Sequence, residues 1–115
     1  MVIAQHWRLR KLIRANLEAL DLEVQEAVNG RHGLECLEKG RPDLIFLDLD
    51  LSENGIQSLL HTLTLRFGTS PVPIILLSAE PPARGLLREV TVQGYLLKPF
   101  DVATLVAQVR DLLNK

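Results

Sequence analysis

The sequence predicts an α/β domain in which five parallel strands form one sheet with helices on both faces. Short, almost wholly apolar runs alternate along the chain with longer segments whose apolar residues recur at helical spacing. Residues 43–47 and 72–77 have the composition of strands that are covered on both faces. Strands that alternate with helices form parallel sheets, because each helix returns the chain to the same end of the sheet.

Residues that favour turns or interrupt helices bound the predicted strands. The second strand runs into the turn dipeptide Asn29-Gly30, and Pro42 stops the preceding helix before the third strand. The third strand ends at Asp48, after which the chain becomes polar up to Gly55. The predicted strands are residues 1–4, 24–28, 43–47, 72–77 and 94–97.

The segments between the strands are predicted helices, because their apolar residues share one helical face. They are residues 7–20, 31–39 (ending at Gly40), the segment after Gly55, residues 82–90, and a last helix capped by Asp101. Cys36 is expected to be a buried small residue rather than a nucleophile. The predicted buried residues are Leu9, Leu12, Ile13, Leu17 and Leu20; Leu34 and Leu37; Ile56, Leu59, Leu60, Leu63 and Phe67; and Leu105, Val106, Val109, Leu112 and Leu113.

The first helix also carries a basic face that has two interpretations. Such a face could bind phosphate, or it could simply be solvated, and acidic residues nearby favour the solvated interpretation. The basic residues are Arg8, Arg10, Lys11 and Arg14, and the acidic ones are Glu18, Asp21, Glu23 and Glu26.

Length and composition limit the classes of function. The 115 residues suffice for one domain, residues 1–115. The formal net charge of -1 gives no basic field for direct nucleic-acid binding, and no apolar run is long enough to cross a membrane. The single cysteine excludes an internal disulfide and indicates a cytoplasmic location.

Polar residues gather where the predicted strands end. The commonest order for five such units is the flavodoxin-like 2-1-3-4-5, with its crevice at the ends of strands one and three. Asp48, Ser78 and Lys98 end three strands, and would meet there although each alone could be an ordinary exposed residue. A carboxylate can act as a nucleophile towards phosphorus, a lysine can neutralise phosphoryl charge, and a hydroxyl can donate a hydrogen bond to it.

Four segments, in order and near the usual spacing, resemble the receiver domains of two-component response regulators, and the resemblance covers essentially the whole chain. Within it, Asp48 stands in the phosphoacceptor place, Ser78 in the place of the switch hydroxyl, and the Lys98–Pro99 peptide bond is expected to be cis. The segments are NGRHGL at 29–34, PDLIFLD at 42–48, PIILLSA at 73–79 and GYLLKPF at 94–100.

The resemblance implies a signalling domain rather than an enzyme, with at most Mg²⁺-dependent self-phosphorylation and dephosphorylation at Asp48. A sensor histidine kinase or phosphotransfer protein would donate the phosphoryl group, Ser78 would turn inward, and Tyr95 would move from an exposed to a buried rotamer. The fourth helix, fifth strand and fifth helix would then present a changed face to an output domain or protein. Val102 and Val106 could belong to that face or to a homodimer interface, although core packing explains both valines as well.

The metal site is where the sequence departs from the family. The cofactor would be Mg²⁺, with Asp48 and the backbone carbonyl of Asp50 among its ligands. Gln5 and His6 stand in place of the usual acidic pair, and histidine suits softer metals than Mg²⁺. The loop from Asp48 to Gly55 also looks one residue shorter than usual, with Ser52 where proline is common. Both features predict a weakened site.

Two functions therefore compete. In one, the domain is a working phosphoreceiver; in the other, it is a degenerate receiver that binds proteins independently of phosphorylation. Asp48, Ser78, Lys98 and Tyr95 favour the first. Gln5, His6 and the short loop after Asp48 favour the second. A nucleotide-binding enzyme is disfavoured, because residues 4–7 contain no glycine-rich phosphate loop.

Overall fold

The computed structural model describes residues 1–50, 56–82, 84–87 and 92–114, which form a doubly wound α/β fold. The five strands pair in parallel in the order β2-β1-β3-β4-β5, so the predicted flavodoxin-like topology is confirmed. The strands are β1 (Val2–Ile3), β2 (Glu26–Ala27), β3 (Ile45–Asp48), β4 (Ile74–Ser78) and β5 (Val92–Leu97). The helices are α1 (Trp7–Glu18), α2 (Gly30–Leu37), α3 (Ile56–Phe67), α4 (Arg84–Leu87) and α5 (Val102–Leu113).

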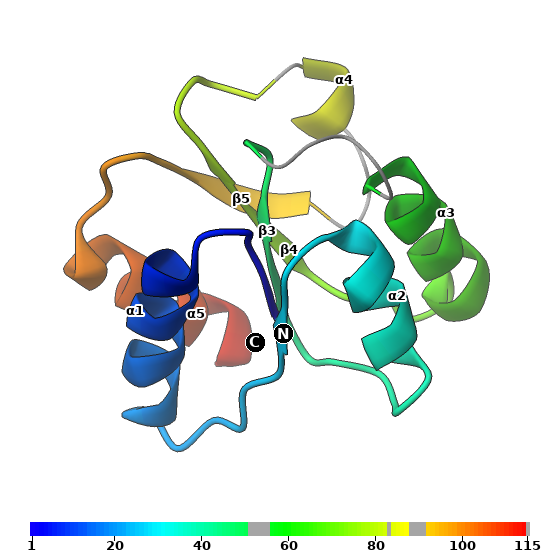
Figure 1. The fold of residues 1–115 in the computed structure, drawn as a ribbon, viewed down its shortest axis with the longest axis horizontal. Helices are drawn as coiled ribbons and strands as arrows, with labels where there is room; N and C mark the ends of the chain where they lie inside the picture. The colour runs from blue at the N-terminus through cyan, green and yellow to red at the C-terminus, as the bar shows by residue number, and fades with distance from the viewer. Residues whose placement is uncertain (51–55, 83, 88–91, 115) are drawn as a thin grey trace.

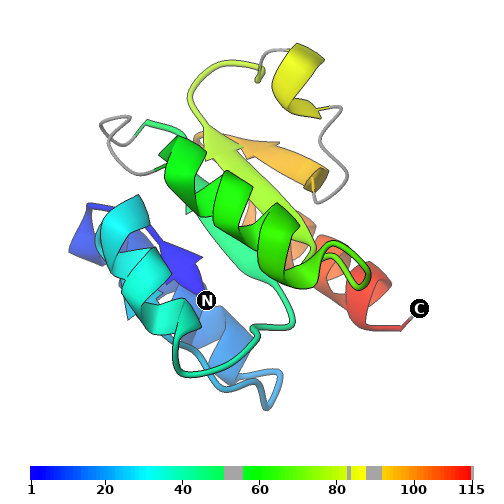
Figure 2. The same cartoon turned by 90° about the vertical axis from the view of Figure 1, so that its right-hand side faces the viewer.

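The helices cover both faces of the sheet. Figure 1 shows α1 and α5 on one side of the strands and α2 and α3 on the other. In Figure 2, which views the molecule from the second side, α2 and α3 lie in front of the sheet. Among the described residues, no helix is long and apolar enough to cross a membrane.

Alternation along the strands divides the core into two clusters. Ile45 and Leu47 of β3 face α2 and α3, whereas Phe46 between them packs with residues of α1 and α5. All three are fully buried, which explains why this run is apolar without interruption. The alternation continues to Asp48, which therefore points to the side of α1 and α5.

Two predicted buried residues and one predicted capping interaction differ from the structure. Leu12 and Leu113 are 45% and 44% exposed, because they lie at the margins of their helical stripes rather than facing the sheet. Asp101 occupies the N-cap position of α5, but its side chain makes no capping hydrogen bond. The fourth helix is described only over Arg84–Leu87, so its predicted end at residues 88–90 lies outside the described residues.

The basic face of α1 binds a carboxylate of the protein itself. Glu26 of β2 pairs with Arg10 at 3.1 Å, Lys11 at 2.9 Å and Arg14 at 2.6 Å. The hydrogen bond from Lys11 is the main cause that lowers the pKa of Glu26; burial opposes it, and with the bonds from Arg14 and Arg10 the pKa falls to about 2. This ion pairing favours the interpretation of the face as structural rather than phosphate-binding.

Candidate functional site

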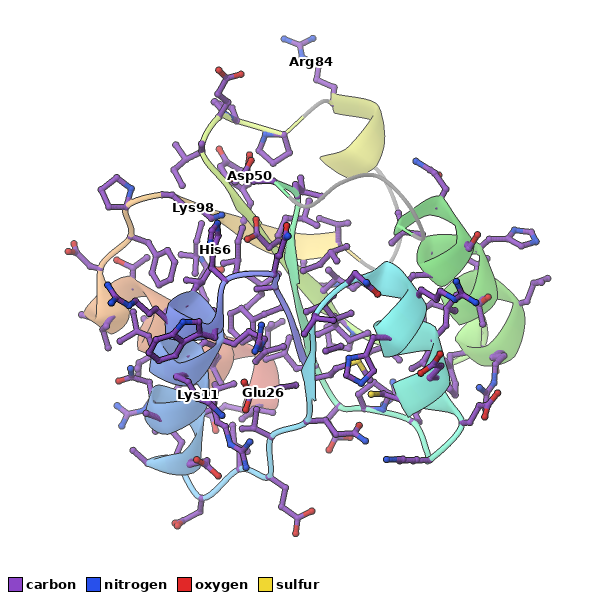
Figure 3. All side chains as sticks on the ribbon, in the orientation of Figure 1. His6, Lys11, Glu26, Asp50, Arg84 and Lys98 are labelled. Atoms are coloured by element: carbon purple, nitrogen blue, oxygen red, sulfur yellow. The ribbon has the colours of Figure 1, made fainter. Side chains whose placement is uncertain are left out.

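The polar residues predicted at the strand ends do meet at one edge of the sheet. Asp48 is the last residue of β3, Ser78 the last of β4, and Lys98 directly follows β5. Because the strands are parallel, their carboxyl ends lie at the same edge. Figure 3 shows Asp50, Lys98 and His6 gathered there, away from Lys11 and Glu26.

A buried ion pair lies at the centre of this edge. Asp48 is only 2% exposed, and Nζ of Lys98 lies 2.8 Å from its Oδ1. Lys98 also pairs with Oδ2 of Asp50 at 2.9 Å. Burial by itself lowers the pKa of Lys98, but the hydrogen bonds to Asp48 and Asp50 outweigh it and raise that pKa above its ordinary value. Lys98 is therefore a permanent positive charge at neutral pH.

The hydroxyl of Ser78 is engaged within its own loop. Ser78 is buried, and its Oγ donates a hydrogen bond to the carbonyl oxygen of Glu80. The same Oγ accepts a hydrogen bond from the backbone N–H of Glu80 at 3.2 Å. The hydroxyl thus lies at the correct strand end but is directed to residue 80 rather than to Asp48.

The side chain of Asp50 belongs to the site. Its backbone N–H donates to Oδ1 of Asp48 at 2.9 Å, and its Oδ2 accepts from the backbone N–H of Ala79 at 3.1 Å. The resemblance to receiver domains implies a role for the backbone carbonyl group of Asp50 but not for its carboxylate. The signal that could have found the carboxylate was its position two residues after Asp48, where it can fold back towards the end of β4.

Gln5 and His6 lie on the exposed segment between β1 and α1. Arg10 holds this segment, because its Nη1 donates to the carbonyl oxygens of Ala4 and Gln5, both at 2.9 Å. In the described part of the chain, no group of three or more His, Cys, Asp or Glu side chains is arranged to hold a metal ion. The donors at this site are the Asp48 carboxylate (which also binds Lys98), the amide of Gln5 and the imidazole of His6. They do not fit the all-oxygen shell of Mg²⁺ well.

A cleft of about 650 Å³ opens beside the ion pair. Trp7, which is 61% exposed, forms part of its wall together with Lys98. The rest of the lining is His6, Arg8, Leu9, Leu12, Pro99 and Phe100. A larger hollow of about 720 Å³ lies around Met1 and Phe46 at the opposite edge and contains none of the strand-end residues above.

Tyr95 lies on β5, away from Asp48. Its ring is on the side of the sheet occupied by α3, because Tyr95 pairs in register with Leu76 of the α2–α3 cluster. Tyr95 is 39% exposed, as either a switch residue before phosphorylation or an ordinary aromatic residue on an edge strand would be. The Lys98–Pro99 peptide bond is cis. The predicted features at Ser52 and Gly55 lie outside the described residues.

Comparison with known proteins identifies one family. The family model for the response regulator receiver domain matches residues 1–110. The chain is 31% identical over its whole length to the DNA-binding dual master transcriptional regulator RpaA of Synechocystis sp., of which it covers 48%. It is 32% identical over 99% of its length to the sensor histidine kinase TmoS of Ectopseudomonas mendocina, of which it covers 12%. The chain thus spans half or less of these relatives.

Solved structures show the same fold. The chemotaxis response regulator CheY4 of Vibrio cholerae superposes with a TM-score of 0.83 at 22% identity, over 96% of this chain and 94% of the other. The response regulator TrrA of Thermotoga maritima, solved in complex with Mg²⁺-BeF, gives a TM-score of 0.79 at 24% identity, over 96% and 95% of the two chains.

Proposed function

Because this chain belongs to the response regulator receiver domain family, we propose that residues 1–115 form one receiver domain that accepts a phosphoryl group on Asp48. The observation that carries this proposal is the contact of 2.8 Å between a buried carboxylate and the ammonium group of Lys98. The donor is a sensor histidine kinase or a phosphotransfer protein, which supplies the group from a phosphohistidine.

The transfer is a displacement at phosphorus. An oxygen of Asp48 forms the new bond to phosphorus, while the bond from phosphorus to the donor's imidazole nitrogen breaks and its electron pair stays on that nitrogen. We assign the attack to Oδ2, because Oδ1 already accepts hydrogen bonds from Lys98 and from the N–H of Asp50. Lys98 offsets the negative charge brought by the phosphoryl group.

The conformational change that follows phosphorylation would involve Ser78 and Tyr95. Ser78 would exchange its bonds to Glu80 for one to a phosphoryl oxygen, and Tyr95 would turn inward on the neighbouring strand. The face formed by α4, β5 and α5 would then bind an output domain, an output protein or a second copy of the chain. The domain itself contacts neither nucleic acid nor membrane, and it catalyses at most its own phosphorylation and dephosphorylation.

We propose that Mg²⁺ binds weakly. Its ligands would be Asp48, the carbonyl oxygen of Asp50 and, at the place of the acidic pair, Gln5 and His6. Receiver domains generally bind Mg²⁺, which supplies positive charge beside the phosphoryl group. In this chain, the exposed amide of Gln5 and the imidazole of His6 supply no negative charge to hold it.

The test is phosphorylation by a small phosphodonor at millimolar Mg²⁺, read by intact mass. We expect one added phosphoryl group that hydroxylamine removes, as it does from an acyl phosphate. Asp48→Asn should abolish the addition. Asp43→Asn is the matched control, because it removes the same charge from the exposed opposite end of the same run.

The competing function is a phosphorylation-independent interaction module, and the observation that favours it is the missing acidic pair. Absence of any added phosphoryl group in the wild-type chain, with no change in Trp7 fluorescence on adding beryllofluoride, would reject the phosphoreceiver in its favour. Trp7 is suited to this because it is the only tryptophan and lies in the cleft beside Lys98.

A further inference from the structure

The carboxylate of Asp50 contacts two hydrogen-bond donors beside Asp48. A single oxygen, Oδ2, accepts the N–H of Ala79 at 3.1 Å and lies 2.9 Å from Nζ of Lys98. Lys98 is simultaneously bound to Asp48. The two donors come from the ends of β4 and β5, and they converge on one point beside the proposed phosphoacceptor.

This point has the chemistry of an oxyanion site. A backbone N–H and an ammonium group bind any anionic oxygen, whether it belongs to a carboxylate or to a phosphoryl group. Asp50 is held at both ends, since its backbone N–H is bonded to Oδ1 of Asp48 while its side chain reaches Ala79. The carboxylate is thus directed into the site rather than into solvent, although Asp50 is half-exposed.

We propose that Asp50 is the resident occupant of this oxyanion site, and that a phosphoryl group on Asp48 must displace it. This rests on the proposed function of Asp48. Asp50 engages Lys98 and Ala79 but leaves the hydroxyl of Ser78 bonded to Glu80. In the unmodified domain, the carboxylate of Asp50 therefore takes the place of a phosphoryl group in part. Only a phosphoryl group on Asp48 would also bind the third donor, the hydroxyl of Ser78.

The experiment uses the whole 115-residue chain, labelled with ¹⁵N, and three variants. Asp50→Ala removes the occupant, and Asp50→Asn removes its charge but keeps an oxygen that can accept from Ala79. Asp43→Ala is the control for loss of one negative charge at the opposite end of β3. Circular dichroism and unfolding curves establish that each variant folds. Two quantities are measured: the ligand-free amide proton shift of Ala79, and the affinity for beryllofluoride at saturating Mg²⁺.

We expect the Ala79 amide proton to move upfield in Asp50→Ala, because it loses an anionic acceptor, and to move less in Asp50→Asn. Asp50→Ala should bind beryllofluoride about tenfold more tightly than wild type, with Asp50→Asn between them and Asp43→Ala unchanged. An unmoved Ala79 signal in Asp50→Ala would overturn the proposal. Equal gains in affinity for the two Asp50 variants would also overturn it, because Asp50 would then act only through its charge.

The two proposals fail in different ways. If the wild-type chain is phosphorylated on Asp48 but neither measured quantity responds to Asp50→Ala, only the role of Asp50 is rejected. If the Ala79 signal moves but no variant binds beryllofluoride or accepts a phosphoryl group, the contact exists but the site is no phosphoryl site. In that case the proposed function of Asp48 is rejected, and the displacement of Asp50 with it.

Discussion

Replacing Glu26 by Gln tests the ion cluster that joins α1 to β2. The pKa of Glu26 falls from 4.5 to about 2 in the folded protein, and each unit corresponds to ~1.36 kcal/mol, which gives an upper limit of about 3 kcal/mol. Lys11 and Arg14 are 56% and 37% exposed, so solvent screening reduces the contribution. We therefore expect Glu26→Gln to lower the free energy of unfolding at pH 7 by about 1 to 2 kcal/mol.

The dependence on pH follows from the direction of the shift. A carboxylate whose folded pKa is lowered stabilises the protein fully above its unfolded pKa, here 4.5, and this contribution disappears as the pH falls through about 2. The difference between wild type and Glu26→Gln should therefore be constant from pH 7 to about pH 5 and vanish near pH 2. Urea unfolding followed by circular dichroism at several pH values measures it.

Glu18→Gln is the matched control for this experiment. Glu18 is 49% exposed and pairs with Arg14 alone among the described cations, at 3.3 Å. Its loss should change stability by less than about 0.5 kcal/mol. Equal effects of the two substitutions, or a Glu26 effect that does not change between pH 5 and pH 2, would refute the reasoning about the cluster.

Three further predictions concern the site and the core. Gln5→Asp with His6→Asp should raise the affinity for Mg²⁺ by about tenfold or more, measured by Trp7 fluorescence, because it restores negative charge; an unchanged affinity would place the defect in the loop after Asp48. Lys98→Met should lower the free energy of unfolding, measured with urea, by about 1 to 3 kcal/mol, because it leaves the buried Asp48 without its cation. Adding Asp48→Asn to this variant should restore part of the lost stability. Phe46→Ala should cost about 3 to 5 kcal/mol in the same assay because Phe46 is fully buried, whereas the exposed Leu113→Ala should cost less than about 0.5 kcal/mol.

The sequence predicted the strands and helices, because apolar runs and helical stripes depend on local spacing. The strand order was predicted from the commonest topology for five such units. The meeting of Asp48 and Lys98 could also be anticipated, since parallel strands bring their carboxyl ends to one edge. The exposure of residues at the margins of the helical stripes could not be anticipated. Leu12 and Leu113 were predicted to be buried, although they are exposed. Their exposure depends on how each helix is rotated against the sheet, which spacing alone does not determine.

The finer features of the site depend on backbone groups and side-chain directions, which cannot be read from the residue types in the sequence. The N–H of Ala79 is a backbone group, so no side chain identifies it as a ligand of Asp50. The direction of the Ser78 hydroxyl likewise depends on its side-chain rotamer and on the path of the loop that follows β4. From the sequence, several acidic residues could have paired with the basic face of α1. The structure shows that Glu26 is the main partner, because β2 pairs with β1 in the register that places Glu26 beside this face.

The division of the core into two clusters has a consequence for how related sequences vary. Neighbours along β3 contribute to different clusters, so Ile45 and Phe46 share no packing environment although they are adjacent in the chain. Phe46 instead packs with Val2 and Ile75, which pair with it in register from the strands on either side. In an alignment of receiver domains, changes of side-chain volume at position 46 should therefore be correlated with changes at positions 2 and 75 and be independent of those at position 45.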